Sequence, residues 1–430
     1  MVAFAMSGRK RDLFPSPVTE VHWGILVAPL AQRLASVRPS ATKAMTARAR
    51  ALRAEGQDVI VLSQGEPDFD TPPDVCDAGI AAIREGHTRY TAVSGIEELR
   101  KAVAAKLRRE NGLDYDPSAI VVGCGAKQVI FNALFATLDP GDEVVVPAPC
   151  WVSYPDMVRL AGGTPVVVNC SAGSGFKLQP DELAAAITPR SKWLMLNSPA
   201  NPTGAVYSEK DLAALGEVLK AHPHVSLLSD DIYEKLVYAP ARFATMAAVV
   251  PELRDRTLLV NGVSKAHAMT GWRVGYGAGP QGLIKAMATI QGQTSSHTSS
   301  VSQYAALEAI GGDQSHLPPF VETFRQRRDL VCERLKRAPG LHCRLPEGAF
   351  YAFVSCRDLI GTQRSDGSVI RSDTDFAMYL LERFGVAVVP GSSFLAEGYF
   401  RASFANSTNA LEKACNRIQA ACEALVREVA

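Results

Sequence analysis

The sequence predicts an α/β protein with a second, smaller α+β domain. Between about residues 95 and 290, short apolar segments rich in β-branched residues alternate with longer amphipathic segments. This alternation is typical of a sheet covered by helices on both faces. After about residue 310 a long charged amphipathic segment is followed by two strand-like segments and a closing helix. At 430 residues the chain is long enough for two such domains.

The elements of the first part follow one another at short intervals. Leu99, Val103 and Leu107 recur four residues apart, which predicts a helix over 97–111 with its Lys and Arg residues on the opposite face. A second helix is predicted at about 128–138. We predict strands at 119–122, 143–146, 192–196, 225–228 and 257–260. In sheets of this kind ligands bind at the carboxyl ends of the strands.

The change of pattern along the chain sets the expected domain boundaries. We predict an N-terminal extension at 1–33, a segment at 34–75 that packs with the small domain, a large domain at 76–325 and a small C-terminal domain at 326–430. In the small domain, helices are expected at 320–337 and 409–428, and strands at 348–354 and 386–389.

Composition and charge are those of an ordinary globular enzyme. Apolar residues make up 47% and charged residues 21%, and the net charge of +1 favours neither nucleic acid nor an anionic membrane as a partner. The nine cysteines are odd in number, scattered and without a Cys-x-x-Cys pair, so we expect reduced thiols in a cytoplasmic protein and no metal site. No apolar run reaches membrane-spanning length, and the N-terminus lacks the charge order of a secretory signal.

One lysine is placed for covalent chemistry. Lys265 follows the predicted strand at 257–260, and Arg273 comes eight residues later, beyond a glycine-containing turn. A buried lysine with a lowered pKa can form an imine with an aldehyde cofactor. Ser264 and Arg273 are suited to hold the phosphate of that cofactor, since arginine grips phosphate oxygens in pairs. This combination points to pyridoxal 5'-phosphate.

Other strand ends carry side chains that suit the same cofactor. Asp230 could face the pyridine nitrogen and keep it protonated, which makes the ring an electron sink. Tyr233 and Asn201 could reach the ring oxygen. Trp151 is placed to stack on the ring, and Arg401 is a candidate partner for a substrate carboxylate.

The glycine-containing turn before the helix at 128–138 is a candidate phosphate site. Gly125, Ala126 and Lys127 open that helix, where free backbone N–H groups bind anions. Taken singly, each candidate has a commoner structural role: a strand-end aspartate caps a turn, a tryptophan packs in a core and an arginine lies on the surface. The prediction depends on the conjunction of these residues and on their order in one chain.

Three motifs in this order resemble a known family. They are Gly65-Glu66-Pro67-Asp68-Phe69-Asp70-Thr71-Pro72, Asn201-Pro202-Thr203-Gly204 and Ser264-Lys265-Ala266-His267-Ala268-Met269-Thr270-Gly271-Trp272-Arg273. From about Leu34 onward the chain resembles class I aminotransferases of the fold-type I pyridoxal-phosphate enzymes. It is most like the bacterial aspartate aminotransferase subgroup that includes aspartate/prephenate aminotransferases.

The resemblance implies a large domain with a mixed, mostly parallel seven-stranded sheet and assigns roles to the candidates. Lys265 would be the Schiff-base lysine and proton shuttle, and Asp230 would pair with the pyridine nitrogen. The backbone of Gly65 would lie over the substrate. Tyr90 resembles the tyrosine that reaches the phosphate of the partner subunit, which implies a homodimer with shared active sites.

The resemblance also bears on the substrate. No arginine occurs between Val274 and Gln303, where eukaryotic-type aspartate aminotransferases have one for the distal carboxylate. Lys127 resembles the lysine of the bacterial subgroup, and Arg38 resembles the basic residue associated with prephenate. We therefore expect transfer of the amino group of aspartate to 2-oxoglutarate, and also to prephenate, by a ping-pong mechanism.

Other functions stay open at this point. The chain could act on aromatic, alanine-like or other neutral amino acids, or as a lyase, because Cys150, His267 and the segment 296–298 depart from the family pattern. His267 is expected to pack and not to catalyse, since Lys265 already carries the proton. A regulatory protein of this fold would need a DNA-binding module ahead of residue 34, and no helix-turn-helix pattern is present there.

Overall fold

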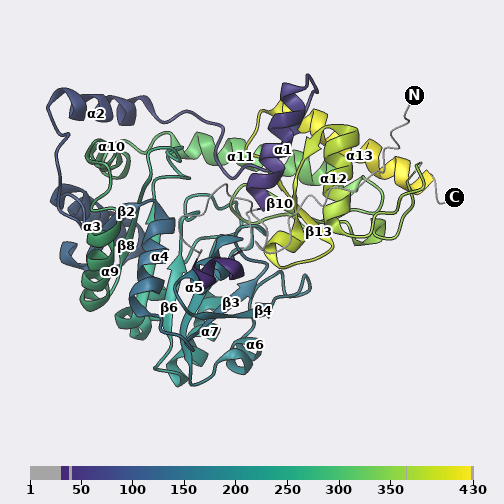
Figure 1. The fold of residues 1–430 in the computed structure, drawn as a ribbon. Helices are drawn as coiled ribbons and strands as arrows, with labels where there is room; N and C mark the ends of the chain where they lie inside the picture. Colours follow the sequence, from purple (N-terminus) through teal and green to yellow (C-terminus); the bar gives the residue numbers. More distant parts are fainter. Residues whose placement is uncertain (1–30, 38–40, 365, 428–430) are drawn as a thin grey trace, which may run out of the picture.

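The computed structural model describes residues 31–37, 41–364 and 366–427. These form two parts that lie side by side, with the sheet-containing larger part below and a smaller part above it in Figure 1. The described chain starts with a short 3-10 helix, η1 (Gln32–Ser36), which lies against α5 (Ser153–Leu160) of the larger part. The prediction for residues 1–30 lies outside the described residues.

A seven-stranded sheet forms the centre of the larger part. Its strand order is β2-β8-β7-β6-β5-β3-β4, and only β8 runs antiparallel to its neighbours. The strands are β2 (Ile120–Cys124), β3 (Glu143–Ala148), β4 (Thr164–Asn169), β5 (Ser191–Asn197), β6 (Ser226–Asp230), β7 (Thr257–Gly262) and β8 (Val274–Ala278). The predicted mixed, mostly parallel sheet is confirmed, and each of the five strands predicted from the pattern is present within a few residues.

Two strands of the sheet were not predicted from the sequence pattern. β4 is one of the two edge strands, and its side chains are exposed or half-buried although Val166, Val167 and Val168 form a short apolar run. β8 is rich in glycine because its neighbours leave no room for side chains. A Cβ on Gly275 would lie 2.2 Å from the backbone nitrogen of Ala126, and one on Gly277 would lie 2.7 Å from a methyl group of Val129. This close approach brings β8 against the start of the helix that follows β2.

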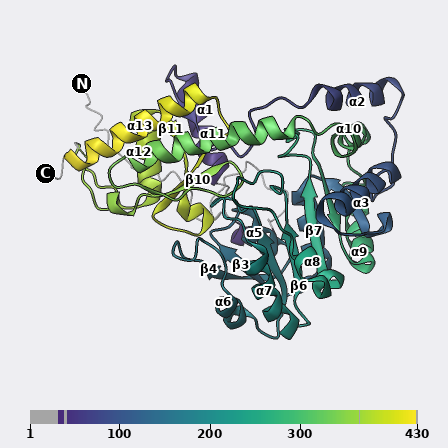
Figure 2. The ribbon, with the colours of Figure 1, turned by 180° about the vertical axis from the view of Figure 1, so that it is seen from behind.

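Helices cover both faces of the sheet (Figures 1 and 2). They are α2 (Pro73–Arg84), α3 (Glu97–Asn111), α4 (Ala126–Thr137), α5, α6 (Pro180–Ala186), α7 (Glu209–Ala221), α8 (Met246–Val249), α9 (Gln281–Thr294) and α10 (Ser300–Gly311). Ile120 and Val122 of β2 join the core under α3 and α10, whereas Val121 joins the core under α4 and α9. This alternation is what a strand buried on both faces requires.

Helix α3 has the predicted bounds, but one of its charged residues is buried, which the pattern did not predict. Leu99, Val103 and Leu107 are buried as expected. Lys106, which the pattern placed with the other charged residues, is only 5% exposed. Its burial depends on an ion pair with Glu234, a residue far away in the sequence. Periodicity along the helix carries no information about that partner.

The smaller part is built from both ends of the described chain. It contains α1 (Ala41–Ala54), β1 (Ile60–Val61), α11 (Leu317–Lys336), β9 (His342–Cys343), β10 (Tyr351–Ser355), α12 (Asp373–Phe384), β11 (Val386–Ala387), β12 (Val389–Pro390), β13 (Tyr399–Ser403) and α13 (Thr408–Arg427). β1 pairs in parallel with β11, and β12-β13-β10-β9 form an antiparallel sheet. Met45, Ala49 and Leu52 of α1 belong to the same hydrophobic core as α12 and α13.

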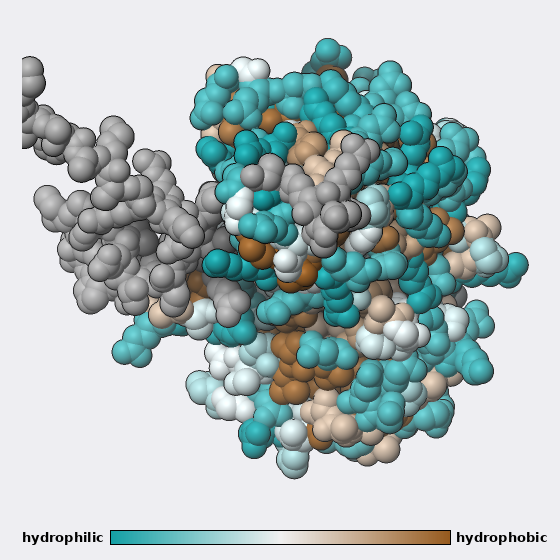
Figure 3. Space-filling model, turned by 90° about the vertical axis from the view of Figure 1, so that its right-hand side faces the viewer, coloured by the Kyte–Doolittle hydropathy of each residue, from teal (hydrophilic) through white to brown (hydrophobic). Residues whose placement is uncertain are grey.

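The predicted domain boundaries stay predictions. The boundary at 75/76 falls within α2, whose Val75 already packs in the core of the larger part. The boundary at 325/326 falls within α11, which runs continuously across the top of the molecule in Figure 2. Among the described residues, no helix has the length and apolar character needed to cross a bilayer. The face seen in Figure 3 is mostly hydrophilic, with a smaller hydrophobic area below its middle.

Candidate active site

A cavity of about 860 Å³ lies where the carboxyl ends of β5, β6 and β7 meet the smaller part. From the larger part it is lined by Ala126, Lys127, Trp151, Val152, Ser153, Tyr154, Asn197, Asn201, Asp230, Ile232, Tyr233, Ser264, Lys265, Thr270 and Arg273. The remaining lining comes from Thr46, Ala47, Arg50, Gln64, Gly65, Glu66, Tyr351 and Arg401. Most of the candidates chosen from the sequence are therefore brought together around one space.

Three predicted site residues are not among those that line the cavity. Gly125 caps α4 directly behind the wall and has a φ of 77°. Tyr90 is 91% exposed and lies edge-on to the ring of His297, with 5.5 Å between the ring centres. Arg38 lies outside the described residues, so its predicted role stays untested.

Lys265 is held at the cavity wall just beyond β7. Its Nζ donates a hydrogen bond to the backbone oxygen of Gly65. Burial, and after it the nearby charge of Arg401, lowers the pKa of Lys265 to about 8. A larger share of this amine is therefore neutral and nucleophilic near neutral pH than of an ordinary lysine.

Asp230 ends β6 with its carboxylate directed into the protein. It is 4% exposed and receives a hydrogen bond of 2.5 Å from the hydroxyl group of Tyr154. Burial raises the pKa of Asp230 to about 6, while the bond from Tyr154 opposes that rise. Asn197 fixes the backbone here, because its Nδ2 donates to the oxygen of Asp230 at 2.8 Å. A buried carboxylate without a protein cation on it suits a cationic group of a ligand.

Arg401 of β13 contributes a buried guanidinium group to the cavity from the smaller part. It is 3% exposed and donates to Oδ1 of Asn201 at 2.9 Å and to the backbone oxygen of Ser63 at 2.8 Å. Its Nε has no partner among the described residues. Since Oδ1 of Asn201 accepts from Arg401, the amide Nδ2 of Asn201 is the group that remains to donate into the cavity. The arrangement leaves a buried cation that a ligand carboxylate can satisfy.

Two tyrosines line the space between these groups. The hydroxyl groups of Tyr233 and Tyr351 are 2.8 Å apart. The guanidinium group of Arg401 lies 4.4 Å from the ring centre of Tyr351. Burial raises the pKa of Tyr233 well above that of an ordinary tyrosine, so its hydroxyl group stays protonated and can donate a hydrogen bond.

The start of α4 forms the anion-binding end of the cavity. Gly275 lets β8 approach the backbone nitrogen of Ala126, and Arg273, which directly precedes β8, has a φ of 60°. A Cβ on Gly125 would lie 2.6 Å from the guanidinium group of Arg273, so only glycine leaves room for it. Ser264 lines the same space. Free backbone N–H groups at a helix start, a hydroxyl group and an arginine together form a phosphate-type site.

Lys127 lies in the first turn of the same helix. Its Nζ donates to Oγ of Ser153 at 3.2 Å and lies 4.6 Å from the ring centre of Trp151. The ring of Trp151 in turn meets Tyr154 edge-on. Lys127 and Trp151 thus form one wall of the cavity, and their roles at a distal carboxylate and as a ring platform stay predictions.

Sequence reasoning missed several residues of this cavity. Tyr154 and Asn197 hold Asp230 from two sides, and Tyr351 contacts both Tyr233 and Arg401. Asn197 is the last residue of β5 and directly precedes the loop that ends in the Asn-Pro-Thr-Gly motif, which was the available signal. No local pattern marked the two tyrosines. His267 lies outside the cavity lining and is buried against His316.

Comparisons with known proteins agree with this geometry. The family model described as aminotransferase class I and II matches residues 57–418. A probable aspartate/prephenate aminotransferase of Rhizobium leguminosarum bv. phaseoli is 54% identical over 395 residues, which is 92% of this chain and 99% of the relative. The aspartate/prephenate aminotransferase of Cereibacter sphaeroides is 54% identical over 396 residues, again 92% of this chain and 99% of the relative.

Solved structures of similar proteins share the fold. The aspartate aminotransferase of Rhizobium meliloti matches with a TM-score of 0.90 and 52% identity, covering 93% of this chain and 100% of that structure. The aspartate aminotransferase of Thermus thermophilus with maleate matches with a TM-score of 0.86 and 42% identity, covering 92% and 100%.

Proposed function

The chain belongs to the class I and II aminotransferases, and from this premise we propose that it moves the amino group of aspartate to 2-oxoglutarate with pyridoxal 5'-phosphate as cofactor. The observation that carries the proposal is that Arg401 and Lys127 line one cavity with Lys265, apart from Arg273 at the phosphate-type end and the exposed Arg50. Arg401 is buried and its Nε has no partner in the part of the chain that the structure describes, and Lys127 lies beside Trp151. Two cations on one cavity suit a substrate with two carboxylates. The Thermus thermophilus relative is described with maleate, which is also a dicarboxylate.

The residues present fit the proposed cofactor. The N-terminus of α4, Ser264 and Arg273 would hold its phosphate, and Asp230 would face its ring nitrogen. Trp151 would stack on the ring, while Asn201 and Tyr233 would donate to its ring oxygen. When bound, the cofactor supplies an electron sink that allows the substrate Cα to lose its proton.

The residues around that group then divide the remaining work. Arg401 binds and orients the α-carboxylate, and Lys127 binds the distal carboxylate. The Nζ of Lys265, with its pKa of about 8, takes the proton from Cα and returns it on the cofactor side, acting first as general base and then as general acid. The same groups serve both half-reactions in turn, so the amino donor leaves as a 2-oxo acid before the acceptor binds.

We extend the proposal to prephenate as an acceptor, to a homodimer and to a cytoplasmic location. Two relatives are named aspartate/prephenate aminotransferases, and Arg38 would be the residue that favours prephenate. Tyr90, which is exposed beside His297, would reach the phosphate in the partner's active site. The nine cysteines are all free thiols, which supports a reducing compartment.

The test is an assay of the purified protein with bound cofactor. Aspartate and 2-oxoglutarate are supplied, and oxaloacetate is measured by coupling to malate dehydrogenase and NADH. We expect oxaloacetate to form, and the Lys127→Ala variant to raise KM for both dicarboxylates about tenfold to a hundredfold while sparing alanine and phenylalanine. Lys101→Ala, on the exposed face of α3, is the matched control. If no oxaloacetate forms with cofactor bound, the enzyme acts on neutral amino acids instead.

A further inference from the structure

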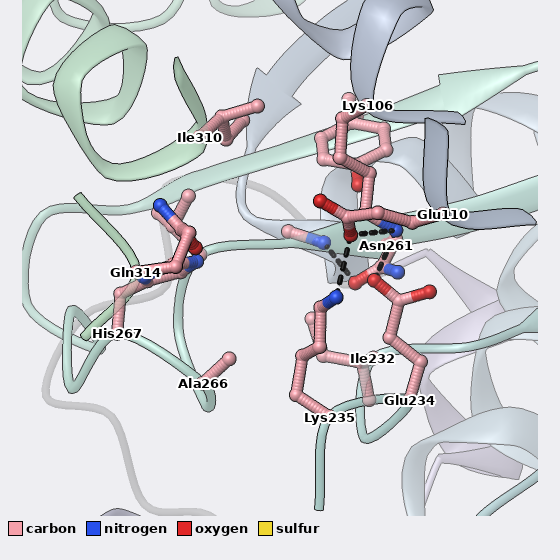
Figure 4. A pocket seen from close by; sticks show the side chains of 13 residues that line it. Lys106, Glu110, Ile232, Glu234, Lys235, Asn261, Ala266, His267, Ile310 and Gln314 are labelled. Atoms are coloured by element: carbon pink, nitrogen blue, oxygen red, sulfur yellow. Dashed lines mark hydrogen bonds and ion pairs between the residues drawn. The ribbon is translucent and has the colours of Figure 1, made fainter. Parts of the chain in front are cut away.

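A second, much smaller cavity of about 20 Å³ lies next to the active-site cavity, and Figure 4 shows the side chains that line it. Ile232 lines both cavities. The two chain segments that form the wall present residues to either side. Asp230, Tyr233, Ser264 and Lys265 line the active-site cavity, whereas Glu234, Lys235, Ala266 and His267 line the small one. A substitution of a residue that lines the small cavity therefore also affects the two chain segments that carry the catalytic side chains.

Lys106 of α3 is the centre of a buried charge network in the small cavity. Its Nζ forms an ion pair with Oε1 of Glu234, donates to Oδ1 of Asn111 at 2.8 Å and lies 3.5 Å from Oε2 of Glu110. Two hydrogen-bond acceptors and the nearby carboxylate of Glu110 thus surround one ammonium group. The Nδ2 of Asn111 returns to Oε2 of Glu234 at 3.0 Å, so that both oxygens of this carboxylate are held from the end of α3.

A second pair extends the network to the neighbouring residue. Lys235 donates to Oε2 of Glu110 at 2.5 Å. In Figure 4 the side chains of Lys106, Glu110, Glu234 and Lys235 converge from two elements toward the same point. The carboxylates of Glu110 and Glu234 compensate the ammonium groups of Lys106 and Lys235, and the exposed Arg109 also pairs with Glu110, which explains how Lys106 can be buried at all. Removing one member would leave an uncompensated charge in a site with little access to water.

The turn held by this network is the one that follows β6. It contains Tyr233 and begins at Asp230. Outside the turn, the nitrogen of Asp231 donates to the oxygen of Val260 at 2.9 Å, and the hydroxyl group of Tyr233 lies 2.8 Å from that of Tyr351. The bond from the nitrogen of Glu234 to the oxygen of Asp231, at 2.9 Å, closes the turn on itself. The side chains of Glu234 and Lys235 therefore link this turn to α3, and Glu234 makes the more deeply buried of the two links.

We propose that Lys106 and Glu234 are positioning residues for the transamination reaction, an inference that rests on the proposed function. Neither residue lines the active-site cavity. Their ion pair holds the turn after β6 against α3 and so sets where Asp230 and Tyr233 stand relative to Lys265. Loss of the pair shifts these groups, and a misplacement on the order of 1 Å can lower a catalysed rate about a hundredfold.

The test compares three holoenzyme variants. Lys106→Met removes the charge at similar length, and Lys106→Arg keeps the charge. Lys101→Met removes a lysine of the same helix whose pair with Glu97 is exposed, with lysine and glutamate side chains 63% and 62% accessible. Each is measured for melting temperature, for the dissociation constant of pyridoxal phosphate, and for kcat per bound cofactor with aspartate. The pH midpoint of the absorbance of the lysine-bound cofactor is the readout that does not depend on turnover.

We expect Lys106→Met to lower kcat per bound cofactor by about tenfold to a hundredfold, with KM for aspartate changed less than about threefold. The absorbance midpoint should move by about half a pH unit or more, because Lys265 and Asp230 no longer keep their spacing. Lys106→Arg should recover most of both properties, and Lys101→Met should match the unmodified enzyme, since exposed pairs contribute little.

Two results would overturn the inference. One is a Lys106→Met enzyme that melts at a lower temperature yet keeps kcat per bound cofactor and the absorbance midpoint, which would make the pair merely structural. If Lys106→Met does not fold, Glu234→Gln keeps the shape and one hydrogen bond, and normal kcat with a normal midpoint in that variant refutes the inference equally. Absence of aspartate turnover in the unmodified enzyme would instead refute the proposed function.

Discussion

Tyr154→Phe is the perturbation that most directly tests how this protein controls Asp230. The substitution removes only the hydroxyl group that donates to Oδ2 of Asp230 at 2.5 Å. The aromatic ring, which is buried and meets Trp151 edge-on, keeps its packing. The change therefore acts on the ionisation of one carboxyl group and not on the shape of the cavity.

The size of the effect follows from the hydrogen bond that is lost. A bond to an ionised group contributes about 1.5 to 3 kcal/mol, and one pKa unit corresponds to about 1.4 kcal/mol. The bond from Tyr154 stabilises the carboxylate, so its loss raises the pKa of Asp230. Starting from about 6, the new pKa of the cofactor-free protein should be about one to two units higher. At neutral pH much of Asp230 would then be protonated and unable to pair with a ring cation.

The assay is a titration of the cofactor-free protein with pyridoxal phosphate at several pH values. We expect Tyr154→Phe to bind the cofactor about tenfold more weakly than the unmodified protein near neutral pH, with the difference shrinking as pH rises through the raised pKa. Tyr238→Phe is the matched control, because its buried hydroxyl group donates to the backbone of Ala349 and not to Asp230. Equal affinities for Tyr154→Phe and the unmodified protein at every pH would refute the reasoning.

Three further outcomes can be checked with single variants. Arg401→Lys should raise KM for aspartate about tenfold to a hundredfold in steady-state kinetics, because a lysine cannot grip a carboxylate in pairs; an unchanged KM would place the α-carboxylate elsewhere. Lys265→Met should abolish transamination and, in urea unfolding near pH 7, stabilise the cofactor-free protein by about 1 to 3 kcal/mol. The buried ammonium group lowers the free energy of unfolding at pH values below its folded pKa of about 8. This cost decreases as pH rises from there toward the unfolded value of 10.5. The stability gained by Lys265→Met should therefore become smaller at high pH. Gly275→Ala should lower the melting temperature and weaken phosphate binding, measured with the cofactor-free protein, because its methyl group would meet the backbone of Ala126 at 2.2 Å.

Much of the fold could be predicted from local pattern. The helix at 97–111 and the strands around 120, 145, 194, 227 and 259 were visible because apolar spacing within a short window reports burial. β8 escaped because Gly275 and Gly277 carry no apolar side chain, although the sheet needs both glycines for its contact with α4. Its existence follows from the neighbouring backbones and not from its own residues.

The candidate site likewise contains residues that could be predicted from the sequence and residues that could not. Lys265, Asp230, Asn201 and Tyr233 could be chosen because each follows a predicted strand and has chemistry that suits one cofactor. Arg401 could also be chosen as a candidate for a substrate carboxylate, whereas the role of Lys127 at a distal carboxylate needed a resemblance to a family, since an isolated cation usually lies on a surface. The sequence pattern placed Lys106 on the charged face of α3, and this was wrong. The sequence of the helix does not indicate that the carboxylate of Glu234, which belongs to another element, pairs with Lys106.

The sequence by itself determined the order of strands and helices, the chemistry available at the strand ends and the lysine on which the proposed reaction depends. Only the tertiary structure decided which side chains set the properties of those groups. The bonds from Tyr154 to Asp230, from Lys106 to Glu234 and from Arg401 to Asn201 join residues 76, 128 and 200 positions apart. Local periodicity reports the burial of a residue but not its distant partner, and it is the partner that determines the pKa, the charge balance and the orientation of a buried polar group.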